Sequence, residues 1–107
     1  MELSSKEINE KLYNNEDFIL DCYAKWCQPC LVMLPHLEMA TKTIHQNNPN
    51  FGVFKYNIDT DRDFTDYLGI RSVPTLKIIK KGKIVETKVG VTFEKELLSL
   101  YNKHFNN

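Results

Sequence analysis

Two cysteines three residues apart are the residues of this sequence best suited to chemistry. They are Cys27 and Cys30 in the stretch KWCQPC, with Gln28 and Pro29 between them. On a helix, residues three apart lie about 60° from each other, so both sulfurs can face the same place and bond to each other. The pattern allows three interpretations: a metal site, a structural disulfide, or a pair that makes and breaks a disulfide as its function.

The residues around the pair predict a strand before it and a helix after it. The stretch DFILDCYA is apolar at both parities except for Asp21, which is typical of a strand covered on both faces of a sheet. After the cysteines, apolar residues recur at steps of four, three and four, which predicts a long helix ending near residues 47–50, with a kink at Pro35. The apolar residues of this helix are Met33, Leu37, Ala40 and Ile44.

A cysteine at the start of that helix is expected to ionise readily. The unpaired backbone N–H groups and the positive end of the helix dipole favour an anion there, and such cysteines have pKa values of about 3.5–7.5. Cys27 is therefore the candidate nucleophile. Cys30, one turn further on, is suited to resolve the mixed disulfide that an attack would form.

The metal and structural interpretations fit the sequence less well. A structural zinc site needs four ligands, usually with a second Cys or His pair at a matching spacing, and the sequence has no such pair. Cys22 lies mid-strand, and His36 falls about 240° round the helix from Cys30. A disulfide that closes so short a loop removes little entropy from the unfolded chain. We therefore expect a redox pair and no metal.

The first helix and a second strand–helix unit are also visible. Ser4 and Glu7 have the spacing of a capping box at the start of a helix. Residues 51–58 predict a second buried strand, and residues 59–69 a short helix that Gly69 closes. The order strand, helix, strand, helix is typical of a βαβ unit.

The last third of the chain predicts a hairpin and a closing helix. Two β-rich runs within residues 75–89 meet at Gly82, which can supply the positive φ of a hairpin turn. Thr92 is expected to start the last helix, with Phe93, Leu97, Tyr101 and His104 along one face. A βαβ half followed by a ββα half gives an α/β fold, and we expect residues 1–107 to form a single domain.

Charge and composition exclude several classes of function. Fourteen Lys plus Arg balance fourteen Asp plus Glu, and no long block of either sign offers a footprint for nucleic acid or anionic membrane. No stretch approaches the roughly 18 apolar residues of a membrane span, and residues 1–15 lack the apolar run of a secretory signal. We therefore expect a cytoplasmic protein, and in that compartment a close cysteine pair is more often metal-binding or catalytic than structural.

Several spaced motifs resemble the thioredoxin family over nearly the whole chain. They are DCYAKWCQPC, a proline eight residues after Cys27, KYNID, RSVPT, and the glycines of KKGK and KVGV. A Cys-x-x-Cys pair near a βαβ pattern is itself a thioredoxin-like signature. The resemblance implies a thioredoxin fold, with a central mixed β-sheet flanked by helices on both faces. Gln28 stands where the family usually has glycine.

Asp21 is a lone carboxyl inside an apolar strand, where burial should raise its pKa. The resemblance implies that Asp21 is the general acid/base that relays a proton for Cys30, with Lys55 nearby to tune it. The alternative is a buried Asp21–Lys55 pair that only holds two strands together.

The resemblance also implies a client-binding surface around the cysteines. Trp26 would lie on the surface beside them, and Val73 would precede a cis proline and pair its backbone with a bound client segment. Gly90 and Val91 would complete an apolar rim. The alternatives are a core aromatic, a strand-end glycine and a core valine. The predicted client-binding residues are Trp26, Gln28, Pro29, Val73, Pro74, Gly90 and Val91.

The expected function is that of a protein-disulfide reductase, an electron carrier for cell redox homeostasis. Cys27 attacks a client disulfide and Cys30 resolves the adduct, which leaves an oxidised Cys27–Cys30 pair. The resemblance implies re-reduction by a flavoprotein thioredoxin reductase that uses NADPH, so the chain itself needs no bound cofactor. It also implies ribonucleotide reductase, peroxiredoxins and methionine sulfoxide reductases as clients. We expect a monomer.

Two other functions compete with this one. The first is a docking or chaperone-like binding module, in which redox turnover is incidental. The second is an oxidase or isomerase, which we expect less because residues 1–15 do not resemble a signal segment and no His lies between the cysteines. Cys22 is expected to be a small buried hydrophobe, with a second redox role as the alternative.

Overall fold

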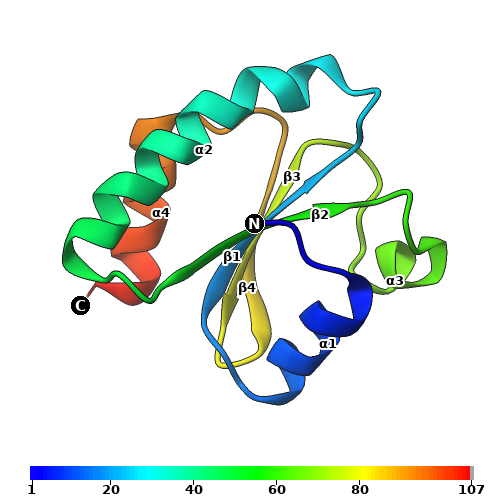
Figure 1. Ribbon diagram of the computed structural model, residues 1–107, viewed down its shortest axis with the longest axis horizontal. Helices are drawn as coiled ribbons and strands as arrows, with labels where there is room; N and C mark the ends of the chain where they lie inside the picture. The colour runs from blue at the N-terminus through cyan, green and yellow to red at the C-terminus, as the bar shows by residue number, and fades with distance from the viewer. Residues whose placement is uncertain (107) are drawn as a thin grey trace.

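The computed structural model describes residues 1–106 and combines one mixed sheet with four helices in this part of the chain (Figure 1). The helices are α1 (Ser5–Tyr13), α2 (Gln28–Asn47), α3 (Arg62–Tyr67) and α4 (Glu94–Phe105). The strands are β1 (Phe18–Tyr23), β2 (Gly52–Asn57), β3 (Thr75–Lys80) and β4 (Lys83–Val89). Their order in the sheet is β2-β1-β3-β4, with β1 and β2 parallel and the other neighbours antiparallel.

Apolar side chains cover both faces of the sheet, as the pattern of DFILDCYA predicts. α2 and α4 lie on one side of the sheet and α1 and α3 on the other (Figure 1). Ile19 packs into the core beneath α2 and α4, whereas Phe18 and Leu20 pack into the core on the α1 side. Alternation along β1 therefore sends neighbouring residues into two different cores. The predicted fold class, a mixed sheet with helices on both faces, is confirmed.

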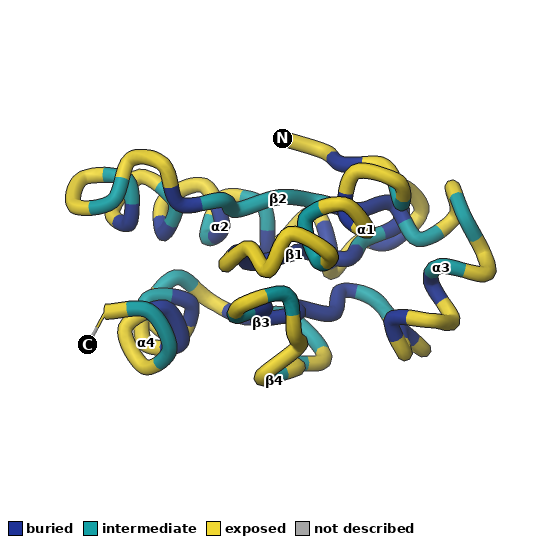
Figure 2. Tube along the Cα trace, turned by 90° about the horizontal axis from the view of Figure 1, so that it is seen from below, coloured by how far each residue is buried: buried dark blue, intermediate teal, exposed yellow. Residues whose placement is uncertain are grey.

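The helix after the cysteines has the predicted face and end. All four of its predicted apolar residues are buried, and α2 ends at Asn47, within the expected range. Buried and exposed stretches alternate along α2 in Figure 2, as a periodic apolar face requires. The predicted capping box of α1 is also present, because Ser4 and Glu7 exchange hydrogen bonds between side chain and backbone.

Two predictions about the elements are wrong in part. The second strand is not buried throughout, because residues 52–55 are only half-buried. β2 is an edge strand that pairs on its outer side with one N-terminal residue, Glu2. The last helix begins at Glu94, because the backbone of Phe93 is still extended. Phe93 caps the helix and packs against the ring of His36, with 54% of its surface exposed.

The hairpin between β3 and β4 turns at the predicted glycine. Lys81 and Gly82 both have positive φ values, 52° and 76°, which match the right-handed twist of the two strands. A side chain at Gly82 would also collide with the backbone carbonyl of Leu12, so this position excludes a Cβ atom for two independent reasons.

Candidate active site

The two cysteines occupy the first turn of α2 and are joined by a disulfide, with their Cα atoms 5.3 Å apart. Cys27 is the N-cap residue, and its Sγ atom accepts a hydrogen bond from the backbone N–H of Cys30 at 3.2 Å. An N-cap side chain normally accepts from the third helical residue, the position that Cys30 occupies. Pro29 lies in the first turn, where its missing N–H leaves no helical bond unmade. The helix start thus directs a donor at the predicted nucleophile.

The cysteines sit at the boundary between the core and the solvent. Both sulfur-bearing side chains are buried in a small cluster with Ala24, against which Tyr23, Ile58 and Val73 pack. Gln28 and Pro29, between the cysteines, are exposed. The residues between the two cysteines are therefore accessible to a client, while the cysteine side chains themselves are largely covered.

Asp21 is almost completely buried within β1. Only 1% of its surface is exposed, and neither carboxylate oxygen has a hydrogen-bond partner among the described residues. Burial raises the pKa of Asp21 to about 6, although the positive charge of Lys55 partly opposes this rise. Near neutral pH this carboxyl can both accept and release a proton, which suits a proton relay.

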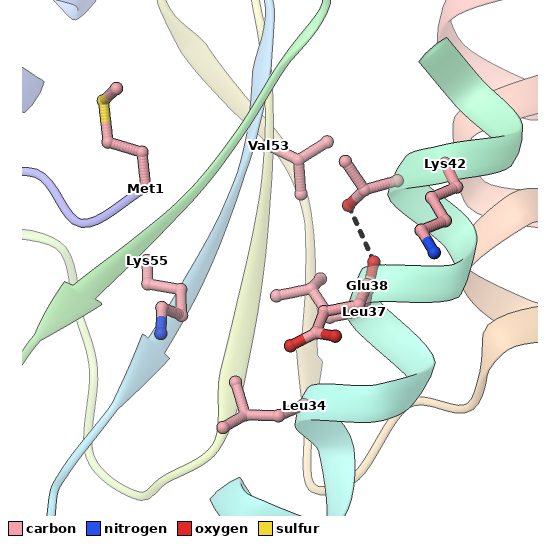
Figure 3. Close-up of a pocket in the computed structure, with 8 residues that line it drawn as sticks. Met1, Leu34, Leu37, Glu38, Lys42, Val53 and Lys55 are labelled. Carbon is pink, nitrogen blue, oxygen red and sulfur yellow. Dashed lines mark hydrogen bonds between the residues drawn. The ribbon is translucent and has the colours of Figure 1, made fainter. Parts of the chain in front are cut away.

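Lys55 reaches the same region from the neighbouring strand. Its backbone is the register partner of Asp21, and its ammonium lies 5.4 Å from the centre of the Tyr23 ring. Lys55 and Cys30 both line a cavity of about 150 Å³ behind the disulfide, together with Tyr23 and Leu34. Figure 3 shows the adjoining pocket between β2 and α2, to which Lys55 and Leu34 also contribute. Of the predicted catalytic residues, Lys55 and Cys30 therefore line the same cavity, and Asp21 is the register partner of Lys55 on β1.

Several of the predicted client-binding residues lie beside the pair, since Trp26, Gln28 and Pro29 are its neighbours in sequence and Val73 packs against the cysteine cluster. Trp26 is 69% exposed, and its indole Nε1–H donates to the carboxylate of Asp59 at 2.9 Å. The peptide bond between Val73 and Pro74 is cis, as predicted. The backbone N–H of Gly90 donates to the carbonyl of Pro74 at 2.9 Å, so these two residues are adjacent.

Among the residues predicted to form the apolar rim around the cysteines, Val91 has the position that suits this role least. It is half-buried and packs against the core beneath α2 and α4.

Cys22 is fully buried on the opposite face of β1, and burial raises the pKa of its thiol far above its usual range. A thiol in such surroundings stays protonated and unreactive.

Sequence reasoning missed Ile58 and Asp59, which follow β2 directly. Ile58 packs against the cysteine cluster and Asp59 holds the indole of Trp26. Because β1 and β2 are parallel, the residues that follow both strands meet at the same edge of the sheet. That pairing, applied to the motif KYNID, is the signal that could have placed them beside Trp26.

The described part of the chain contains neither a cluster of metal ligands nor a helix that could span a membrane. Within residues 1–106, no three His, Cys, Asp or Glu side chains gather in a way that could hold a metal ion. None of the helices in this range combines the length and the apolar character needed to cross a membrane.

Comparison with known families gives a match over almost the whole chain. The family model described as "Thioredoxin" matches residues 1–103. The chain belongs to the thioredoxin family. Thioredoxins of known sequence include one from Rickettsia typhi, 34% identical over 89% of this chain and 88% of its own length. Another, from Buchnera aphidicola, is 32% identical over 99% of this chain and 96% of its own length.

A solved structure agrees with the family assignment. The thioredoxin of Plasmodium falciparum superimposes with a TM-score of 0.81 and 28% identity, over 97% of this chain and 99% of that one. Thioredoxins are protein-disulfide oxidoreductases that act on disulfide-containing client proteins, are reduced by thioredoxin reductase and need no bound cofactor of their own. This thioredoxin is accordingly a disulfide reductase with the Cys27–Cys30 disulfide as its redox pair.

Proposed function

We propose that Cys27 is the nucleophile of this thioredoxin, that Cys30 resolves the mixed disulfide, and that Asp21 relays the proton of Cys30 under the influence of Lys55. The observation that supports this order is the hydrogen bond from the Cys30 N–H to Cys27 Sγ at the start of α2. A donor and a helix dipole aimed at one sulfur favour its thiolate over that of its neighbour.

The first step transfers the electron pair of the Cys27 thiolate to one sulfur of the client disulfide. A bond forms between that sulfur and Cys27, the client disulfide breaks, and the second client sulfur leaves as a thiolate that takes up a proton. The chain is then bound to its client through Cys27, and the thiol of Cys30 remains protonated.

The second step releases the client. Asp21 accepts the Cys30 proton, and the resulting thiolate attacks Cys27 Sγ, which forms the Cys27–Cys30 bond and breaks the bond to the client. The client sulfur leaves Cys27 as a thiolate and takes up a proton, so the client departs with two thiols and has gained two electrons from the cysteine pair. A carboxyl with a pKa of about 6 is mostly ionised at neutral pH, as an acceptor must be.

Client recognition is proposed to use the exposed surface around the pair. Trp26, just before α2, and Gln28 and Pro29, in its first turn, would contact the client. The backbone of Val73 would pair with an extended client segment. The bond from Gly90 to the Pro74 carbonyl fixes the loop that presents Val73. Val91 completes this surface in the proposal.

The source of electrons and the setting belong to the same proposal. An NADPH-dependent flavoprotein thioredoxin reductase would re-reduce the pair, and the clients would include ribonucleotide reductase, peroxiredoxins and methionine sulfoxide reductases. The chain would work in the cytoplasm as a monomer, with residues 1–107 as one domain. The competing function is a docking or chaperone-like module in which the cysteines do not turn over.

A trapping experiment separates the two functions. The C30S variant should accumulate mixed disulfides between Cys27 and client proteins, because the resolving thiol is missing, while the matched C27S variant should trap none. The wild-type protein should also reduce insulin with NADPH and a thioredoxin reductase. Equal trapping by both variants, or an inert wild-type protein, would favour the docking module.

A further inference from the structure

The N-terminal residues of the chain are fastened to β2 at the position of Lys55. The N–H of Leu3 donates to the carbonyl of Lys55 at 2.8 Å, and the N–H of Lys55 donates to the carbonyl of Met1 at 2.9 Å. These two bonds bracket Glu2, which is the bridge partner of Lys55. Partners in neighbouring strands point their side chains to the same face, so Glu2, Lys55 and Asp21 form one row across the sheet.

The side chain of Glu2 reaches past Lys55 to β1. Its carboxylate accepts a hydrogen bond from the hydroxyl of Tyr23, and the ring of Tyr23 lies against the Lys55 ammonium at 5.4 Å. Burial and the nearby Glu2 raise the pKa of Tyr23 to about 12, so the hydroxyl remains a donor throughout the working pH range. The carboxylate fixes the ring at one end, and the ring's face offers the ammonium a cation–π contact.

The position of this ammonium matters because Lys55 has no carboxylate partner in the described chain. The ion pairs found there join other residues, and the oxygens of Asp21 accept no hydrogen bond. A lysine stem has four rotatable bonds, so without the Tyr23 ring the charge would move over several Å. How strongly the positive charge of Lys55 acts on the Asp21 carboxyl then depends on what holds the Tyr23 ring in place.

We propose that Glu2 is a positioning residue for the exchange reaction: its carboxylate holds the Tyr23 ring, and the ring holds the Lys55 ammonium near Asp21 and Cys30. This inference rests on the proposed roles of Asp21 and Lys55. Glu2 touches neither client nor cysteine, and acts through Tyr23 and Lys55 alone.

Few ionisable groups lie around the cavity behind the disulfide and the adjoining pocket, so their effects on Asp21 can be separated by experiment. Those that line the cavity behind the disulfide or the adjoining pocket are Tyr23, Lys25, Cys30, Glu38, Lys42, Lys55 and Met1, which carries the N-terminal amine. In the oxidised protein Cys30 does not titrate, and two variants that differ only at residue 2 share all the other groups. The titration of Asp21 is therefore a clean reporter of where the Lys55 charge lies.

The test compares two variants of Glu2 by NMR titration of the Asp21 carboxyl carbon in the oxidised protein. E2Q loses the charge but keeps an oxygen that can accept from Tyr23, whereas E2A loses both. Both variants lose the same charge. The difference between their Asp21 pKa values therefore reports only whether residue 2 still holds the Tyr23 ring. We expect a higher Asp21 pKa in E2A than in E2Q, by roughly half a pH unit, because the ammonium moves away.

The K55M background supplies the control. There the difference between E2A and E2Q should vanish, since no ammonium remains to be held. Equal pKa values in E2A and E2Q with Lys55 present, or a difference that survives K55M, would overturn the role of Glu2. A separate insulin-reduction assay of D21N tests the proposed function: unchanged turnover would remove the relay, while the Glu2 effect on the titration could still be observed.

Discussion

The backbone N–H of Cys30 points at the Sγ atom of Cys27, with a nitrogen–sulfur distance of 3.2 Å. This places Cys27 in the role that Ser, Thr or Asp plays at other helix starts, where a side-chain acceptor satisfies an unpaired backbone donor. When the disulfide is reduced, the same donor can stabilise a thiolate. The difference in reactivity between two chemically identical side chains thus follows from their positions on one helical turn.

Asp21→Asn should stabilise the oxidised protein above about pH 6. Burial raises the pKa of Asp21 from its usual 3.8 to about 6 in the folded state, so the folded state binds the proton more tightly than the unfolded state. The wild-type protein then loses stability as the pH rises from about 4 to about 6, and the loss levels off near 3 kcal/mol.

Urea unfolding of both proteins across this pH range measures the effect. The difference in unfolding free energy between D21N and wild type should grow through pH 4–6 by about 2–3 kcal/mol and then stay constant. The buried amide of Asn has its own cost, but that cost does not change with pH. A difference independent of pH would show that Asp21 titrates as an ordinary exposed acid.

Asp59→Ala should weaken client binding by releasing the indole of Trp26. The hydrogen bond between the Trp26 Nε1–H and Asp59 is exposed, so its loss is expected to cost about 0.5–1.5 kcal/mol, or roughly a two- to tenfold rise in KM for a protein client. The fluorescence of Trp26, the single tryptophan of the chain, reports its release directly. D59N keeps an acceptor oxygen and should retain most of the binding, and equal KM values for D59A and wild type would contradict the assignment.

Gly82→Ala should destabilise the fold more than Gly69→Ala. The two glycines have nearly the same φ, 76° and 75°, so the backbone cost of about 1–2 kcal/mol is common to both. A Cβ at Gly82 would collide with the carbonyl of Leu12, whereas a Cβ at Gly69 would meet open space. Thermal unfolding of the two variants compares them, and equal losses would show that the turn moves away from α1 at no cost.

The local sequence pattern was sufficient to predict the elements that position the cysteines. The apolar run of β1, the stepped face of α2 and the capping box at Ser4 depend on residues close in sequence, and all three are present. Cys27 and Cys30 were found for the same reason, since one helical turn fixes their separation.

Features that depend on contacts between distant segments could not be predicted in this way. The half-burial of β2 follows from its place at the sheet edge, which is set by the whole topology. The extended backbone at Phe93, where the ring packs against His36 of another helix, likewise has no local signal. The bonds from Trp26 to Asp59 and from Tyr23 to Glu2 span more than 20 residues each, and periodicity carries no information about them.

The pH dependence of Cys27 alkylation in the reduced protein tests the central claim most directly. Iodoacetamide modification of reduced C30S, followed by mass spectrometry, isolates this one sulfur, and the buried Cys22 serves as an unreactive internal control. We predict an inflection in the rate at or below about pH 7.5, with C27S unmodified in the same range. An inflection near the value of a free cysteine, about pH 8.5, would contradict an activated thiolate at the start of α2.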